Sequence, residues 1–251
     1  MKIAVIAGAS SSLGYEYAVQ ISKHFKNIKE IWLIDNKVDK IGEIEKVIHN
    51  KKIKRISLNL SKDESYVTYK EMLEKNNARI KILINTAVYV GDRGFEKSSY
   101  KRQANIVNIN CKAMVAITKI SVPYMYFNSY ILNVGSIAGY IPMPNFSTYS
   151  AANSMIMSFS KALNRELKNR GIRVTAVVLS NVAIKFLSME NRNVIFEEAD
   201  VLQGAEKIVK KSLRDAVLMR KNISVYEIGD KVMIFLSKFI PYKVLVKYYY
   251  L

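Results

Sequence analysis

Two hydroxyl side chains and one amide stand at spacings that suit chemistry on a carbonyl or an alcohol. Ser136 and Tyr149 are thirteen residues apart, and Asn153 follows the tyrosine by four. A serine hydroxyl can donate a hydrogen bond to a substrate oxygen and stabilise negative charge that develops there. A tyrosine hydroxyl can give that oxygen a proton, or take one from an alcohol. These residues therefore form the candidate catalytic group.

The uncharged Asn153 predicts which direction of reaction is favoured. A free tyrosine has a pKa of about 10, so roughly one phenol in a thousand is ionised at pH 7. A neighbouring positive charge would lower that pKa, and the amide of Asn153 carries none. Oxidation of an alcohol needs the ionised base and suffers most. Reduction suffers less, because the neutral phenol is already the proton donor.

Short apolar runs alternate with longer amphipathic segments along the chain. Continuous apolar strands between helices predict an α/β fold with a single doubly wound parallel sheet and helices on both faces. The predicted strands are 3–7, 31–34, 53–58, 80–84, 130–134, 172–179 and 223–227. The predicted helices are 13–25, 39–49, 63–75, 100–125, 148–169 and 201–218. We expect one domain over residues 1–251.

A glycine-containing turn follows the first predicted strand. Residues 7–14 read Ala-Gly-Ala-Ser-Ser-Ser-Leu-Gly. A strand, turn and helix in this order point backbone N–H groups and the positive helix end toward a pyrophosphate. Gly8 permits the tight turn, Gly14 permits close contact between helix and strand, and the hydroxyls of Ser10 and Ser12 can add phosphate contacts. The turn predicts a dinucleotide site.

Asp35 stands at the end of the second predicted strand, twenty-one residues beyond Gly14. A carboxylate there can bind both ribose hydroxyls of an adenosine and repels a 2′-phosphate. NAD(H) is therefore favoured, and NADP(H) is not excluded. The alternative is that Asp35 caps a turn or the next helix.

In the order of these motifs, the chain resembles the short-chain dehydrogenase/reductase family over about residues 1–190. The resemblance implies a Rossmann-like domain and hydride transfer between a nicotinamide and an alcohol or carbonyl. It places the family's glycine motif on Gly8, Ser12 and Gly14, and the catalytic serine and tyrosine on Ser136 and Tyr149. The family's structural and proton-relay asparagine matches Asn110, and its catalytic lysine position holds Asn153. The adenine-contacting position matches Asn59, and the element after the fourth strand matches residues 85–88, Asn-Thr-Ala-Val.

These matches define the predicted cofactor-binding residues. They are Gly8, Ser10, Ser12, Leu13, Gly14, Asp35, Asn59, Leu60, Asn85, Ala87, Tyr149, Asn153 and Val182. The predicted activity is NAD(H)-linked reduction of an apolar carbonyl, or oxidation of the corresponding alcohol. The alternative is a catalytically weak or inactive relative that acts as a dinucleotide-binding or scaffold subunit. No metal site is predicted, because Cys111 is the single cysteine and the two histidines lie far apart.

Two later segments have candidate roles of their own. Residues 180–202 include several large apolar side chains and are expected to cover the substrate pocket. Residues 229–251 are basic, apolar and aromatic, and they can pack on the core, bind another subunit, or contact a membrane surface through 231–251. By resemblance, the predicted helices 100–125 and 148–169 would assemble a homo-dimer or homo-tetramer.

Charge and composition bound the partners. The formal net charge of the 251-residue chain is +18, but the lysines are scattered and no DNA-reading motif appears. We therefore expect a solvated basic surface and no nucleic-acid partner. The lone cysteine, the absence of a signal peptide and the lack of a long apolar run favour a cytoplasmic setting.

Overall fold

The computed structural model describes residues 1–36, 42–90, 94–180, 198–241 and 243–245. Within these ranges the chain forms a seven-stranded, parallel sheet in the order β3-β2-β1-β4-β5-β6-β7. The strands are β1 (Lys2–Ala7), β2 (Glu30–Asp35), β3 (Lys52–Ser57), β4 (Arg79–Asn85), β5 (Met125–Ser136), β6 (Arg173–Leu179) and β7 (Ile223–Val225). The predicted doubly wound parallel sheet is confirmed.

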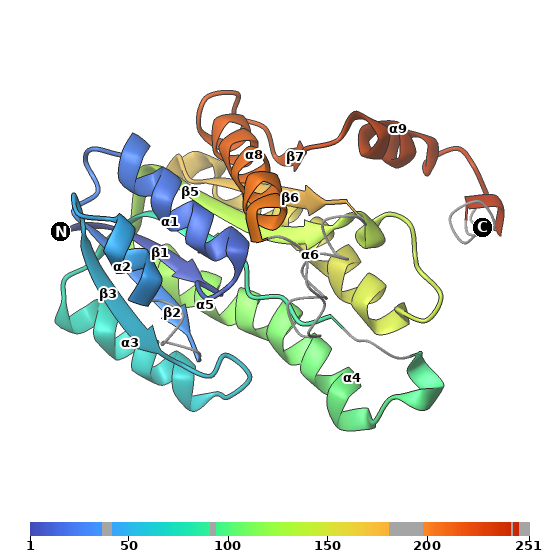
Figure 1. Cartoon of the computed structure of the whole chain (residues 1–251), viewed down its shortest axis with the longest axis horizontal. Helices are drawn as coiled ribbons and strands as arrows, with labels where there is room; N and C mark the ends of the chain where they lie inside the picture. Colours follow the sequence, from blue (N-terminus) through green and yellow to red (C-terminus); the bar gives the residue numbers. More distant parts are fainter. Residues whose placement is uncertain (37–41, 91–93, 181–197, 242, 246–251) are drawn as a thin grey trace.

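Helices cover both faces of this sheet (Figure 1). They are α1 (Ser12–His24), α2 (Gly42–Val47), α3 (Glu64–Lys75), α4 (Tyr100–Val107), α5 (Met114–Ser121), α6 (Ser147–Glu166), α8 (Glu198–Val217) and α9 (Ile228–Leu236). Successive residues of a strand point to opposite faces. Ala4 and Ile6 of β1 therefore pack with α1, α2 and α8, whereas Ile3 and Val5 pack with α3 and α5. This explains why β1 is apolar throughout.

The chain reverses its winding direction between β1 and β4. From β1 it moves outward to β2 and β3, and it then returns to place β4 on the other side of β1. Ligands of open α/β sheets bind beyond the carboxyl ends of the strands at such a switch point. The strand order therefore directs attention to the loops that follow β1, β4 and β5.

The long helical stretch predicted over residues 100–125 is present from Tyr100 to Tyr124, but it is not one regular α-helix. The segment divides into α4, a π-helical turn (Asn108–Ala113), α5 and a 3₁₀ turn (Val122–Tyr124). Pro123 stands in the first positions of that last turn, where its missing N–H costs least. The next strand begins at Met125, earlier than the predicted Tyr130.

Other boundaries shift by a few residues at most. Helix α8 begins at Glu198, so the last part of the predicted pocket cover belongs to a helix. Helix α2 occupies Gly42–Val47, and the predicted start of that helix at residues 39–41 lies outside the described residues. The last predicted strand is present as β7, which pairs in parallel with β6 at the edge of the sheet.

Candidate active site

The glycine-containing turn of residues 7–14, here called the phosphate turn, joins β1 to α1 with almost no free space around its glycines. Gly8 has a φ of +91°, and a Cβ there would lie 2.3 Å from the backbone nitrogen of Ala87. A Cβ on Gly14 would lie 2.4 Å from the carbonyl oxygen of Gly8. Both positions therefore require glycine, one for its backbone conformation and both for close approach. This is the kind of cradle in which backbone N–H groups can approach a phosphate.

Serine side chains hold this turn in shape. Ser11 is the N-cap of α1: its Oγ accepts a hydrogen bond from Gly14 N at 3.0 Å and donates one to Gly8 O at 2.8 Å. Ser11 was missing from the predicted site residues, although a serine just before an amphipathic helix signals a cap. The predicted residues Ser12 and Leu13 begin the first turn of α1.

Asp35 reaches the phosphate turn from the end of β2. Its Oδ2 accepts a hydrogen bond from the backbone nitrogen of Ser10 at 3.1 Å. The turn-capping alternative is therefore present in the structure, and the same contact holds the carboxylate beside the predicted dinucleotide site. The ribose-binding role of Asp35 remains a prediction.

Asn59 and Leu60 follow β3 and differ in their surroundings. Asn59 is exposed, and its Oδ1 accepts hydrogen bonds from the backbone nitrogen and the hydroxyl of Ser61. Leu60 is buried and lines a cavity. The structure gives Asn59 a local turn-forming contact and turns Leu60 toward the switch point.

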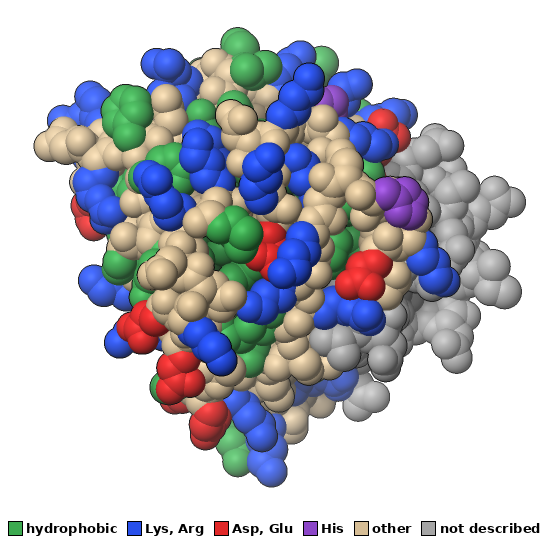
Figure 2. Space-filling view, turned by 90° about the vertical axis from the view of Figure 1, so that its left-hand side faces the viewer, with side chains coloured by type: hydrophobic (Ala, Val, Ile, Leu, Met, Phe, Trp, Pro, Cys, Tyr) green, Lys and Arg blue, Asp and Glu red, His purple; other side chains and the backbone are tan. Residues whose placement is uncertain are grey.

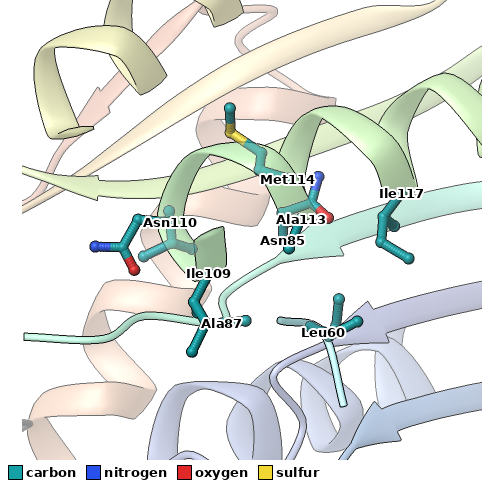
Figure 3. Close-up of a pocket in the computed structure, with 10 residues that line it drawn as sticks. Leu60, Asn85, Ala87, Ile109, Asn110, Ala113, Met114 and Ile117 are labelled. Carbon is teal, nitrogen blue, oxygen red and sulfur yellow. The ribbon is translucent and has the colours of Figure 1, made fainter. Parts of the chain in front are cut away.

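That cavity lies where β1, β4 and the helix after it meet (Figure 3). Its volume is about 10 Å³, which is space for the centre of a single water molecule. It is lined by Ala7, Leu60, Asn85, Ala87, Ile109, Asn110, Ala113, Met114, Ile117 and Val134. The cavity therefore brings together four of the predicted site residues from three separate stretches of the chain, namely Leu60, Asn85, Ala87 and Asn110.

Buried amides and hydroxyls cross the sheet beside the cavity. The Nδ2 of Asn85 donates to Thr118 Oγ1 at 3.0 Å and to Asn133 Oδ1 at 2.8 Å. Asn133 in turn donates to Ser160 Oγ at 2.9 Å. Sequence reasoning did not find this network, which joins α5, β4, β5 and α6. Polar residues inside apolar strands were its only local signal.

Two oxygens at the end of β4 lack partners. Asn85 Oδ1 and Thr86 Oγ1 are buried and form no hydrogen bond with the described residues. An unsatisfied buried acceptor costs about 1–3 kcal/mol. Both groups lie at the carboxyl end of β4, which faces the switch point, so a bound ligand or water there would satisfy them.

The π-helical turn contains Asn110. Its Oδ1 accepts from Tyr89 N at 2.7 Å, and its Nδ2 donates to Tyr89 O at 3.0 Å. The side chain thus clamps the backbone of the segment after β4. Such π turns often occur at functional sites. The geometry accounts for a structural role of Asn110, while the proton-relay role stays a prediction.

Ser136 and Tyr149 come together at the carboxyl end of β5. Ser136 ends the strand and Tyr149 stands in the first turn of α6; both are buried. The Ser136 side chain lies close enough to the Tyr149 hydroxyl to lower its pKa, and its Oγ accepts a hydrogen bond from Ala138 N at 3.0 Å. The two oxygens therefore converge as the sequence predicts.

Burial sets the pKa of Tyr149. Removal of the phenol from water raises the pKa to about 12, even though side-chain hydrogen bonds from Ser136 and Asn153 lower it. The expectation that the pKa stays near 10 is therefore corrected upward. At pH 7 the hydroxyl is a proton donor, and only roughly one in 100,000 is ionised.

Asn153 lies one helical turn after Tyr149 and is buried. Its Nδ2 donates to the main-chain carbonyl of Tyr149 at 2.8 Å. A Cβ on Gly135 would lie 3.1 Å from Asn153 Oδ1 and 2.4 Å from Met157 Cε, so these two side chains of α6 occupy the space beside Gly135. The position thus holds a neutral amide tied to its own helix.

Some predicted residues fall outside the described ranges. Val182 and residues 181–197 of the predicted pocket cover are among them. The geometry above therefore concerns the floor of the candidate site: the glycine turn, the ends of β2, β4 and β5, and the start of α6.

Sequence comparison agrees with this arrangement. A family model for short chain dehydrogenases matches residues 2–194. The chain belongs to the short-chain dehydrogenase/reductase family. A very-long-chain 3-oxoacyl-CoA reductase of Neurospora crassa is 33% identical over 185 residues, which are 70% of this chain and 54% of the relative. A 17-beta-hydroxysteroid dehydrogenase type 3 of Rattus norvegicus is 26% identical over 216 residues, 84% of this chain and 68% of the relative. The chain spans about half the length of the reductases that it matches.

Solved structures share the fold. A short-chain dehydrogenase from Sphingobium yanoikuyae in complex with NADPH superposes with a TM-score of 0.75 at 19% identity, covering 96% of this chain and 97% of the other. A short-chain dehydrogenase/reductase from Burkholderia phymatum in complex with NAD also gives a TM-score of 0.75, at 17% identity and with 94% and 92% coverage. At these identities the likeness shows the fold alone.

Proposed function

We propose that this protein is a nicotinamide-dependent oxidoreductase that works best as a carbonyl reductase. The observation that carries the proposal is the buried pair of Ser136 and Tyr149, which lie next to each other at the carboxyl end of β5. Burial keeps the phenol of Tyr149 in its neutral, proton-donating form. A neutral phenol suits reduction, in which the substrate oxygen must gain a proton. The named activities of the reductase and dehydrogenase relatives support the same class of reaction.

The residues at the switch point fit a dinucleotide. A Cβ at Gly8 or Gly14 would clash with the backbone that shapes the turn. Asn85 Oδ1 and Thr86 Oγ1 are buried and have no hydrogen-bond partner among the described residues. Bound there, the nicotinamide would supply the hydride for reduction. Asp35, held on the turn through Ser10, favours NADH over NADPH. One solved structure of this fold contains NADPH and another contains NAD, which supports a nicotinamide dinucleotide as the cofactor. The proposed preference for NADH over NADPH therefore depends on Asp35.

The chain's own groups have separate tasks in this reaction. Ser136 donates a hydrogen bond to the substrate oxygen and stabilises its developing charge. Tyr149 transfers its proton to the same oxygen. Asn110 fixes the segment after β4 through both of its amide bonds to Tyr89. Asn153 adds no charge to the site, and its side-chain amide donates a hydrogen bond to the main-chain carbonyl of Tyr149.

We further propose an apolar substrate, such as a long-chain 3-oxoacyl thioester or a ketosteroid. The support is the naming of the relatives and the apolar side chains of the predicted cover. A homo-dimer or homo-tetramer formed through α4, α5 and α6 is the assembly that we expect.

Cofactor titration tests the proposal most directly. Quenching of Trp32 and enhancement of reduced-nicotinamide fluorescence would be followed with NADH and with NADPH. We expect saturable binding that is tighter for NADH than for NADPH. In an Asp35→Asn variant, the dissociation constants of the two dinucleotides should lie closer together. Turnover of a 3-oxoacyl thioester or a 17-ketosteroid, lost in Tyr149→Phe, would establish the reaction. If neither NADH nor NADPH gives saturable binding, the proposed nicotinamide-dependent activity is excluded.

A second candidate is a dinucleotide-binding subunit without turnover. The observation that favours it is the neutral, helix-bonded Asn153 beside a phenol with a pKa of about 12. This second candidate predicts saturable dinucleotide binding both in the parent protein and in Tyr149→Phe. It also predicts no oxidation of NADH with either the 3-oxoacyl thioester or the 17-ketosteroid. A single substrate whose reduction requires Tyr149 rules it out.

A further inference from the structure

Helix α9 carries an apolar stripe that faces solvent. Ile228, Val232, Phe235 and Phe239 recur at intervals of four, three and four residues, which places them along one side of the helix and its continuation. Their exposed fractions are 76%, 51%, 58% and 71%. Their rings and branches are therefore available on the surface, and the rings of Phe235 and Phe239 lie 5.2 Å apart between centroids.

The other side of α9 is already used for packing. Met233, Ile234 and Ile240 pack against the core cluster that contains Ile156 of α6 and Val225 of β7. This packing fixes the helix beyond the edge strand, where Figure 1 shows it apart from the helices that cover the sheet. The solvent-facing stripe is thus a second apolar face, and the core does not require it.

Lysines accompany the stripe. Lys231, Lys238 and Lys243 are exposed, and residues 231–251 contain four lysines and no aspartate or glutamate. The nearest carboxylates along the sequence are Asp230, which is buried, and Glu227, which precedes the helix. Apolar side chains with lysines beside them are typical of helices that lie in the interface of a membrane.

We propose that α9 and its continuation to Phe239 dock this protein on an anionic lipid surface, with the stripe among the acyl chains and the lysines at the headgroups. Charge selects this occupant over a second copy of the chain. A two-fold contact through α9 would bring two sets of lysines into one interface of a protein with a formal charge of +18, where like charges repel. An anionic surface neutralises the same lysines. None of the helices in the described ranges has the length and apolarity to cross a membrane.

Charge alone does not distinguish this face from the rest of the molecule. Figure 2 shows Lys and Arg side chains spread over the side of the molecule where the N-terminus lies. Any anionic vesicle will therefore attract the protein to some degree. The proposal requires the stripe as well as the lysines, and the test must separate the two.

Vesicle co-sedimentation of the full chain provides that separation. The vesicles are phosphatidylcholine alone and phosphatidylcholine mixed with phosphatidylserine. We expect binding to the mixed vesicles and a loss of affinity of roughly tenfold or more when Phe235→Ser and Phe239→Ser are combined. The matched control combines Phe95→Ser and Phe127→Ser, whose side chains are 65% and 71% exposed elsewhere on the surface. It should bind as the parent does.

A second pair of variants tests the charge. Lys231→Gln with Lys238→Gln should weaken binding to the mixed vesicles by roughly thirtyfold, because each of the two headgroup-level lysines contributes about 1 kcal/mol. Lys52→Gln with Lys70→Gln removes the same charge from exposed sites on β3 and α3 and should change binding by less than the first pair. Equal losses in both pairs would overturn the proposal, as would failure of the parent to bind mixed vesicles.

Light scattering without vesicles distinguishes the alternative occupant. If the phenylalanine pair lowers the molecular mass of the assembly and leaves vesicle binding unchanged, a second copy covers the stripe and the lipid proposal is wrong. If the double variant unfolds, the single variant Phe239→Ser is measured in its place, because Phe239 lies beyond the end of α9.

Discussion

The side-chain amide of Asn153 donates a 2.8 Å hydrogen bond to the main-chain carbonyl of Tyr149, one turn earlier in α6. The residue that follows the proposed proton donor by four positions is therefore neutral, buried and bonded to its own helix. No charge on this side chain opposes the effect of burial, which raises the pKa of Tyr149 to about 12.

The pH dependence of the two directions should differ. For an alcohol substrate, the rate of oxidation should rise by about tenfold per pH unit between pH 7 and pH 10, because the ionised fraction of Tyr149 does so below its pKa. Reduction should show no loss assignable to Tyr149 over that range. Initial rates in both directions would be measured with saturating dinucleotide. A plateau of oxidation near pH 8 would contradict the raised pKa.

Replacement of Asn153 by lysine should restore a charge beside the phenol. We expect Asn153→Lys to increase alcohol oxidation at pH 7 by about tenfold or more, since each unit by which the pKa of Tyr149 falls raises the ionised fraction tenfold. The change in reduction should be smaller. Asn153→Met is the matched control, because it supplies an unbranched chain without charge. Equal gains in both directions, or the same gain in the methionine variant, would refute the electrostatic explanation.

Gly8 and Gly204 should respond to alanine in opposite ways. Gly8→Ala places a Cβ 2.3 Å from Ala87 N at a φ of +91°, so we expect a stability loss of roughly 1–3 kcal/mol or more and the loss of dinucleotide binding. Gly204 lies within α8 with nothing within 4 Å of its Cβ position. Gly204→Ala should stabilise the protein by up to about 1 kcal/mol and leave binding unchanged. Urea unfolding and NADH titration measure both effects.

Asp230 should make stability depend on pH. Burial, and then the nearby charge of Glu227, raise the pKa of this carboxyl to about 6, and none of the described residues forms a hydrogen bond with its Oδ2. The folded state therefore binds the proton more tightly than the unfolded chain, and stability falls as pH rises from about 4 to 6. Asp230→Asn should add roughly 1–3 kcal/mol at pH 7.5 and little at pH 4. Glu227→Gln, an exposed control, should change stability by less; a gain in Asp230→Asn that is equal at both pH values would refute the linkage.

Much of the fold could be read from local pattern. Each buried strand is short and apolar and is followed by an amphipathic segment, and this repetition is sufficient to predict a parallel sheet covered on both faces. The strict requirement for glycine at positions 8 and 14 was also predictable, because the turn occurs directly after the first strand. Boundaries within residues 100–125 were not, since the π turn forms where Asn110 grips the backbone of Tyr89, a contact between segments that are distant in sequence.

The sequence by itself determined which groups can act: a serine, a tyrosine and, four residues after the tyrosine, a neutral amide. Only the tertiary structure decided how these groups behave. The burial of Tyr149 raises its pKa. The Asn85 Nδ2 donates to Thr118 and Asn133, while its Oδ1 has no hydrogen-bond partner among the described residues. The physical reason is that composition and spacing specify chemical type, whereas desolvation and hydrogen-bond partners depend on side chains that folding brings together.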